Sequence, residues 1–175
     1  MTIAPHTLGA RFSIRDYRPA DFDVLWEIDQ HCFPEGISYS RLELNGFLTR
    51  RNAISLVAES DRPPASAASA GSSQPDDQPR IAGFVVAHSV RQKCGRILTL
   101  DIVPEMRRFG LGSELMLACE QRLRGLGCRE VYLETAVNNE AALRLYGKLG
   151  YEVFEILPEY YASHALDAFR MAKRL

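Results

Sequence analysis

The stretch Arg96-Ile-Leu-Thr-Leu-Asp-Ile-Val-Pro-Glu-Met-Arg-Arg-Phe-Gly-Leu-Gly-Ser113 determines the fold. Residues 97–103 are rich in leucine and β-branched side chains, and they end at Pro104, which has no N–H to continue a ladder. From Leu111 to Leu126 the apolar residues recur every three or four positions, the spacing of a helix that buries one face. The sequence therefore predicts a strand, a short turn and a long amphipathic helix.

The turn between this strand and this helix holds two glycines and two arginines. Gly110 and Gly112 have no side chains, so a ligand can approach the backbone where the first N–H groups and the positive end of the helix dipole face outward. Arg107 and Arg108 add positive charge, although they could be solvated surface residues. The pattern predicts a phosphate-binding turn, and taken alone it would equally suit a dinucleotide or nucleotide site.

The composition excludes several classes of protein. The 175 residues are 46% hydrophobic with a formal net charge of -1, which gives no reason to propose a general surface for nucleic acid or membrane, and we expect neither as a partner. No apolar run reaches about 18 residues and the N-terminus lacks a signal-peptide pattern, so we expect a cytoplasmic protein. The four cysteines form no CxxC pair and no Cys/His cluster, which predicts core thiols rather than a metal site or disulfides.

The rest of the chain alternates strands and helices. Ser40 and Glu43 have the spacing of a capping box, and a later helix is capped by Asn138 or Asn139 and ends at Gly150. A strand, a helix and a strand in succession form a right-handed parallel unit, which predicts an α/β protein with a mixed sheet. The expected strands are 11–17, 53–59, 80–90, 97–103, 129–136, 151–157 and 167–173, with a loop containing 158–161 before the last one.

Two segments are expected to lie outside the packed core. Residues 1–10 are interpreted as a flexible leader, and residues 61–79 as a disordered hairpin insertion because they contain no large apolar side chain. The insertion could instead link two domains, but the part before it, about 60 residues, is small for an independent core. We therefore expect one domain over 11–175.

A second motif follows the central helix, Asn139-Glu-Ala-Ala-Leu-Arg-Leu-Tyr146-Gly-Lys-Leu-Gly150-Tyr151. It resembles the Asn-x-x-Ala-x-x-Leu-Tyr-x-x-x-Gly-Phe/Tyr segment of the GCN5-related N-acetyltransferases, and the arginine-glycine turn resembles the loop with which that family binds the pyrophosphate of acetyl-CoA. The resemblance covers roughly residues 11–175. It implies a largely antiparallel mixed sheet with a central splayed parallel strand pair flanked by helices.

Within this family the chain looks like the RimI-type enzymes, which acetylate the N-terminal α-amine of ribosomal proteins. Three features carry this likeness: Phe33-Pro34 after the first helix, Glu134 twelve residues before Tyr146, and Tyr160-Tyr161 ahead of the last strand. The resemblance implies a protein or peptide N-terminus as acceptor, bound by Phe33, Tyr160 and Tyr161. Glu35-Gly36 departs from the aromatic residue expected after Phe-Pro, and the insertion is not typical of the family.

The resemblance also assigns residues to the cofactor. The backbone of Ile102 and Val103 would pair with the pantetheine arm, and Asn139 would contact the cofactor near its thioester. The pyrophosphate would be held by Arg107, Arg108, Gly110, Gly112 and Ser113.

The chemistry of acetyl transfer calls for a base and an acid. An amine attacks a thioester only when neutral, so Glu134 would take its proton directly or through water. Tyr146 would contact the cofactor at its sulfur and protonate the departing thiolate. A backbone N–H where the 97–103 strand leaves its neighbour could polarise the thioester carbonyl, and no metal is required.

Each assignment has a structural alternative. Tyr146 could be a core aromatic residue, Glu134 a salt-bridged strand residue, and Tyr160 and Tyr161 loop-packing residues. His88 and His164 are isolated in the sequence and could line the acceptor side. Two other functions stay open: acetylation of a small amine such as a polyamine or an antibiotic, and a non-catalytic acyl-CoA sensor.

Overall fold

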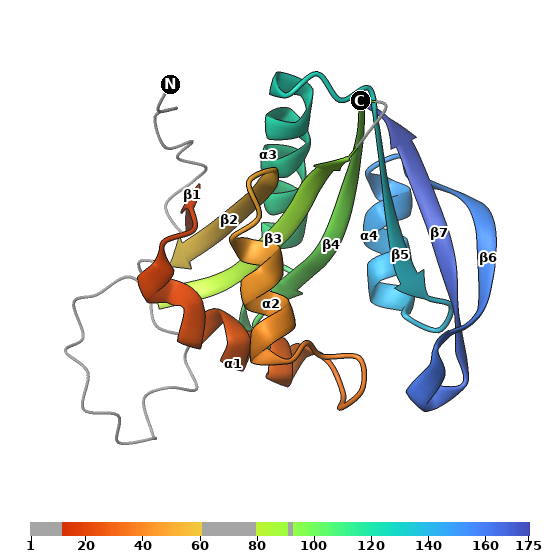
Figure 1. The fold of residues 1–175 in the computed structure, drawn as a ribbon, viewed down its shortest axis with the longest axis horizontal. Coiled ribbons are helices and arrows are strands. Elements are labelled where there is room, and N and C mark those ends of the chain that lie inside the picture. Colours follow the sequence, from red (N-terminus) through yellow and green to blue (C-terminus); the bar gives the residue numbers. More distant parts are fainter. Residues whose placement is uncertain (1–11, 61–79, 91–92) are drawn as a thin grey trace.

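A computed structural model describes residues 12–60, 80–90 and 93–175, and its strands form one seven-stranded sheet in the order β1-β2-β3-β4-β5-β7-β6 (Figure 1). The predicted leader and insertion lie outside the described residues. The strands are β1 (Phe12–Asp16), β2 (Ala53–Ser60), β3 (Arg80–Val90), β4 (Cys94–Ile102), β5 (Glu130–Ala136), β6 (Glu152–Tyr161) and β7 (Leu166–Arg174). The helices are α1 (Phe22–Cys32), α2 (Arg41–Leu48), α3 (Leu111–Gly125) and α4 (Glu140–Lys148).

The predicted parallel unit is β4-α3-β5, and it is confirmed. β4 pairs with β5 in parallel over Cys94–Arg96 only, whereas β4 continues to Ile102 and β5 continues to Ala136. The other neighbouring strand pairs of the described sheet are antiparallel. The sheet is therefore mixed and largely antiparallel, with a central pair of strands that separate, as the family resemblance implied.

Helices cover both faces of the sheet (Figure 1). α3 and α4 pack on one face over a core that includes Leu115 and Val131, while α1 and α2 pack on the other over Phe84. All four cysteines are free thiols; two are buried and two are half-buried, so the expectation of core thiols holds in part. None of the helices that the structure describes is long and apolar enough to cross a membrane.

The helix ends follow the predicted capping chemistry. The Ser40 hydroxyl accepts a hydrogen bond from the N–H of Glu43, and the Glu43 carboxylate accepts one from the N–H of Ser40. Of the two candidate caps of α4, Asn139 is the one used, because its Oδ1 accepts from the N–H of Ala142 at 3.2 Å. Gly150 follows that helix with a φ of 88°, a left-handed conformation that favours glycine.

The prediction of a loop containing 158–161 was wrong, because these residues belong to β6. The register of β6 with β7 shifts between Leu157 and Tyr161, and Glu159 has a φ of 50°. The N–H of Glu159 donates to Asp167 Oδ1 at 2.8 Å instead of to the ladder. β6 is an edge strand, where a bulge accommodates Pro158 even though it lacks an N–H.

We expect Gly83→Ala to lower the free energy of unfolding by about 1–3 kcal/mol. A Cβ at Gly83 in β3 would lie 2.5 Å from the Asp101 carbonyl oxygen, so the β3–β4 ladder would have to shift. Gly147→Ala is the matched control, because a Cβ there has open space and alanine favours the helix by up to about 1 kcal/mol. Urea denaturation measures both, and equal stability of the two variants would contradict the close approach at Gly83.

Candidate active site

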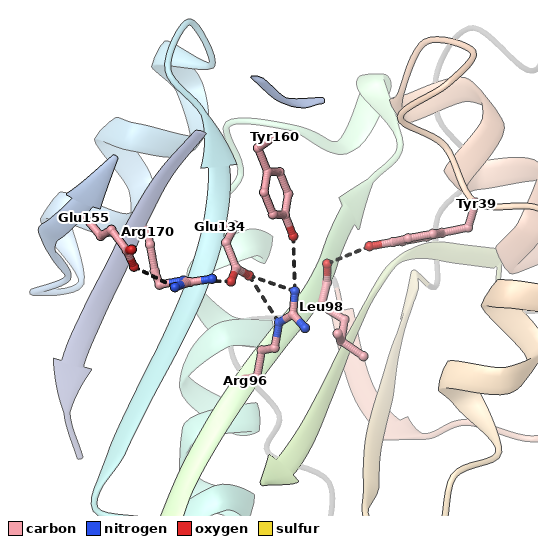
Figure 2. A network of polar contacts seen from close by, with 7 residues as sticks. All are labelled: Tyr39, Arg96, Leu98, Glu134, Glu155, Tyr160 and Arg170. Atoms are coloured by element: carbon pink, nitrogen blue, oxygen red, sulfur yellow. Dashed lines mark hydrogen bonds and ion pairs between the residues drawn. The ribbon is translucent and has the colours of Figure 1, made fainter. Parts of the chain in front are cut away.

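The gap between β4 and β5 is bridged by a charged network centred on Glu134 (Figure 2). The Glu134 side chain is only 5% exposed, and Arg96, the last β4 residue paired with β5, donates from Nε to its Oε2 at 3.2 Å. Arg170 of β7 donates from Nε to its Oε1 at 3.0 Å. Both carboxylate oxygens of the predicted base therefore accept bonds from guanidinium groups.

The same network extends to β6. Arg170 also donates to Glu155 at 2.6 Å, and Arg96 donates to the hydroxyl of Tyr160 at 3.2 Å. Side chains from β4, β5, β6 and β7 thus meet around Glu134. Sequence reasoning missed Arg96 and Arg170, because only the strand register places Arg170 opposite Glu134.

Tyr39, in the segment between α1 and α2, reaches β4 from the other side of the gap (Figure 2). Its hydroxyl donates a hydrogen bond to the Leu98 carbonyl at 3.1 Å. Leu98 has no partner residue in β3, because the register of the two strands shifts at this point. The Tyr39 N–H donates to Asp29 Oδ2 at 2.7 Å, and its carbonyl accepts from Trp26 and Gln30. Tyr39 is therefore held at three points, and no local motif marks it as a site residue.

Tyr146 lies buried on α4, where its ring is 5.8 Å from that of Tyr151. Burial raises the pKa of its hydroxyl, and the nearby carboxyl of Asp101 adds to this rise. The hydroxyl is therefore protonated near neutral pH, as it also is at the ordinary pKa of tyrosine. Among the described residues that hydroxyl has no hydrogen-bond partner.

The predicted acceptor-binding residues come from two segments that touch. Phe33 is half-buried at the end of α1, and the neighbouring Gly36 carbonyl accepts a hydrogen bond from Ser163, after β6, at 3.2 Å. The rings of Tyr160 and Tyr161 pack edge to face at 5.1 Å, and burial raises the pKa of Tyr161 to about 12. The segment after α1 and the end of β6 thus lie on either side of the gap between β4 and β5.

The two candidate histidines differ in position. His88 is buried and its Nε2 contacts the Phe47 carbonyl at 2.9 Å, while burial lowers its pKa. His164 is exposed beside Ser163, 2.8 Å from that hydroxyl. Only His164 therefore adjoins the contact between the two segments.

The arginine-glycine turn has the backbone of an anion cradle. Arg108 and Gly110 have φ values of 68° and 85°, and a Cβ at Gly110 would meet nothing within 4 Å. α3 starts at Leu111, so its first amides lack helical acceptors at this open surface. A Cβ at Gly112 would lie 3.2 Å from Leu145, so that glycine also allows α4 to pack closely.

The other predicted cofactor residues already make contacts. The Ile102 carbonyl accepts from Arg107 Nε at 3.0 Å, so this side chain folds toward β4. The N–H of Val103 donates to Ala82, and its carbonyl accepts from Met106. Asn139 is half-buried and uses Oδ1 to cap α4. Ser113 lies half-buried in the first turn of α3.

Residues 22–151 match the model of the acetyltransferase (GNAT) family, and the chain belongs to that family. It is therefore an acetyl-CoA-dependent N-acetyltransferase. An N-alpha-acetyltransferase of Sulfurisphaera tokodaii is 30% identical over 179 residues, an alignment that covers all of both proteins.

Two solved structures share the fold. The chain resembles Arabidopsis thaliana NAA60 in complex with acetyl-CoA, with a TM-score of 0.78, 23% identity and coverage of 94% of this chain and 99% of the other. It also resembles the ribosomal-protein-S18-alanine N-acetyltransferase from Escherichia coli, with a TM-score of 0.72, 21% identity and coverage of 93% of both chains. The overall fold is thus shared with both of these structures.

The residues present at the turn fit acetyl-CoA. Its pyrophosphate is an anion, and the open backbone at Gly110, the start of α3 and the guanidinium groups of Arg107 and Arg108 all favour negative charge. Within residues 12–60, 80–90 and 93–175, no three His, Cys, Asp or Glu side chains gather as a metal site would require.

Two buried carboxyl groups, which the sequence reasoning missed, lie on the α1 side of β4. Asp29 of α1 is 0% exposed and Asp101 of β4 is 1% exposed. Each has one oxygen without a hydrogen-bond partner among the described residues, Oδ1 in Asp29 and Oδ2 in Asp101. Burial raises the pKa of Asp29 to about 6.

We expect the stability of the wild type to fall, relative to Asp29→Asn, as pH rises from 4 to 7. The folded protein keeps the Asp29 proton up to a pKa of about 6, whereas the unfolded chain releases it near pH 4, so the folded state binds more protons in this window. The difference in the free energy of unfolding should change by up to about 3 kcal/mol. Denaturation at several pH values measures it, and a constant difference would show that Asp29 titrates normally.

Proposed function

We propose that the acceptor is the N-terminal α-amine of a protein or peptide, of the kind that ribosomal proteins present. The full-length similarity to an N-alpha-acetyltransferase is the observation that carries this proposal. The contact between Ser163 and Gly36 supports it, because two segments that meet beside the gap favour a slender acceptor such as an extended chain end. Phe33, Tyr160 and Tyr161 would line the acceptor's path.

The turn and β4 would hold the cofactor. Arg107, Arg108, Gly110, Gly112 and Ser113 would bind its pyrophosphate through charge and backbone N–H groups. A hydrogen bond from the pantetheine arm to the Ile102 carbonyl would compete with the bond that Arg107 donates to the same oxygen. A bond to the Val103 carbonyl would share an oxygen that already accepts from the N–H of Met106. Asn139 would use its amide N–H₂, since its Oδ1 caps α4.

The reacting groups would be Glu134 and Tyr146. Acetyl-CoA supplies an activated acetyl group as a thioester. Glu134 would take the acceptor's proton through water, because its two oxygens already accept bonds from arginines. Tyr146, which is protonated near neutral pH, would donate to the departing sulfur.

A thiol-release assay with acetyl-CoA tests the acceptor. The panel would contain peptides that vary in their first residues, the same peptides with blocked N-termini, and small amines including polyamines and aminoglycosides. We expect turnover of free N-terminal peptides only. Turnover of a small amine with inactive peptides would contradict the proposal, and binding of CoA without any turnover would indicate a sensor.

We expect Tyr146→Phe to lower kcat by about 100-fold or more while the Kd for CoA stays within about twofold, because the change removes only the hydroxyl that donates the proton. Tyr151→Phe is the matched control: its hydroxyl donates to buried Glu120 at 3.0 Å, so its loss should reduce thermal stability but not the rate. Steady-state kinetics and calorimetry measure these effects. An unchanged kcat in Tyr146→Phe would rule out Tyr146 as the acid.

A further inference from the structure

Asp101 is a buried carboxyl group that the proposed mechanism does not yet use. It lies on β4 beyond the last residue paired with β5, and it is 1% exposed. The hydroxyl of Thr99 donates to its Oδ1 at 2.5 Å, while Oδ2 has no partner in the part of the chain that the structure describes. Burying a carboxylate oxygen without a donor is costly, so such a group calls for a specific role.

The elements that form the site meet around Asp101. Apart from Thr99, five charged or titratable groups interact electrostatically with the Asp101 carboxyl. They are Asp29 and Cys32 from α1, Tyr39 from the following segment, Arg107 from the turn and Tyr146 from α4. Asp29 opposes ionisation of Asp101 and Arg107 favours it. The guanidinium of Arg107 bonds to the Ile102 carbonyl and the Cys32 sulfur rather than to Asp101.

Glu134 and Asp101 therefore differ in whether a carboxylate oxygen is left to accept a further hydrogen bond. Glu134 lies on β5 and both its oxygens accept from arginines, whereas Asp101 lies on β4 with one oxygen unbonded. Burial raises the pKa of Asp101 well above its ordinary value. A base that must receive a proton from an ammonium near neutral pH works best with a pKa shifted in this direction.

We propose that Asp101 is a second proton acceptor in the acetyl-transfer reaction, which takes a proton from the acceptor's ammonium group directly or through one water. The step converts R–NH₃⁺ and the Asp101 carboxylate into R–NH₂ and the Asp101 carboxylic acid, and the electron pair of the broken N–H bond stays on nitrogen. Asp101 would take the proton on the α1 side of β4, and Glu134 would take it on the β5 side. The proposal rests on the proposed amine acceptor and adds a residue to it.

Asp101→Asn tests the proposal, because it keeps the shape and the bond from Thr99 but cannot take the proton. The assay uses whichever amine the wild type acetylates, so failure of peptides as acceptors would not count against Asp101. We expect kcat/KM near neutral pH to fall at least about tenfold, the rising limb of its pH profile to move, and the Kd for CoA to stay within about twofold. Asp29→Asn, the matched buried carboxyl, keeps the proton acceptor, so kcat/KM on the plateau should stay within about twofold of the wild type. Its rising limb should move only toward lower pH, because Asp29 opposes ionisation of Asp101.

A measurement on the wild type decides the matter even if the variant does not fold. Carbon-13 NMR of protein labelled at aspartate carboxyls follows the titration of Asp101 without turnover. We expect a pKa well above that of an exposed aspartate, and a change of that pKa when the amine binds. A kcat/KM profile of Asp101→Asn within twofold of the wild type at every pH, or an ordinary pKa for Asp101, would overturn the proposal.

Discussion

The separation of β4 from β5 after three paired residues is the constraint on which the rest of the site depends. Buried backbone N–H and C=O groups need hydrogen-bond partners. Where two parallel strands separate, other groups must supply these hydrogen bonds. Side chains bond to two carbonyls of β4: Arg107 to that of Ile102, and Tyr39 to that of Leu98, which has no partner residue in β3. Beyond the paired residues, these polar contacts satisfy backbone carbonyls of β4.

The charges around the gap are unevenly distributed. On the β5 side, Glu134 is held between Arg96 and Arg170. Desolvation of the buried charges offsets much of their attraction, whereas removal of one partner would leave an unpaired buried charge. On the α1 side of β4, Asp29 and Asp101 have no arginine or lysine bonded to their carboxyls among the described residues. The carboxyl oxygens that lack a bonded donor in the described part of the site therefore lie on the α1 side.

Local chemistry made much of the fold predictable. The capping box at Ser40 and the strand-turn-helix around Gly110 depend on neighbours in sequence, and the structure confirms both. The partners of Glu134 lie 36 and 38 residues away, so no local pattern could reveal them. Asp101 was inconspicuous for a different reason, because an acidic residue inside an apolar strand gives no sign of which face it occupies.

Pro158 shows how a usual rule can mislead. Proline commonly ends a strand, but on the edge strand β6 it lies in a bulge that still returns Tyr160 and Tyr161 to the site. The same bulge has a consequence for the solubility of the folded chain. β6 exposes Val153, Phe154 and Ile156 along an open edge, which is where another molecule could add a strand. A proline and a left-handed residue interrupt that row of hydrogen-bonding groups, so the irregularity next to the proposed acceptor-binding tyrosines also opposes edge-to-edge aggregation.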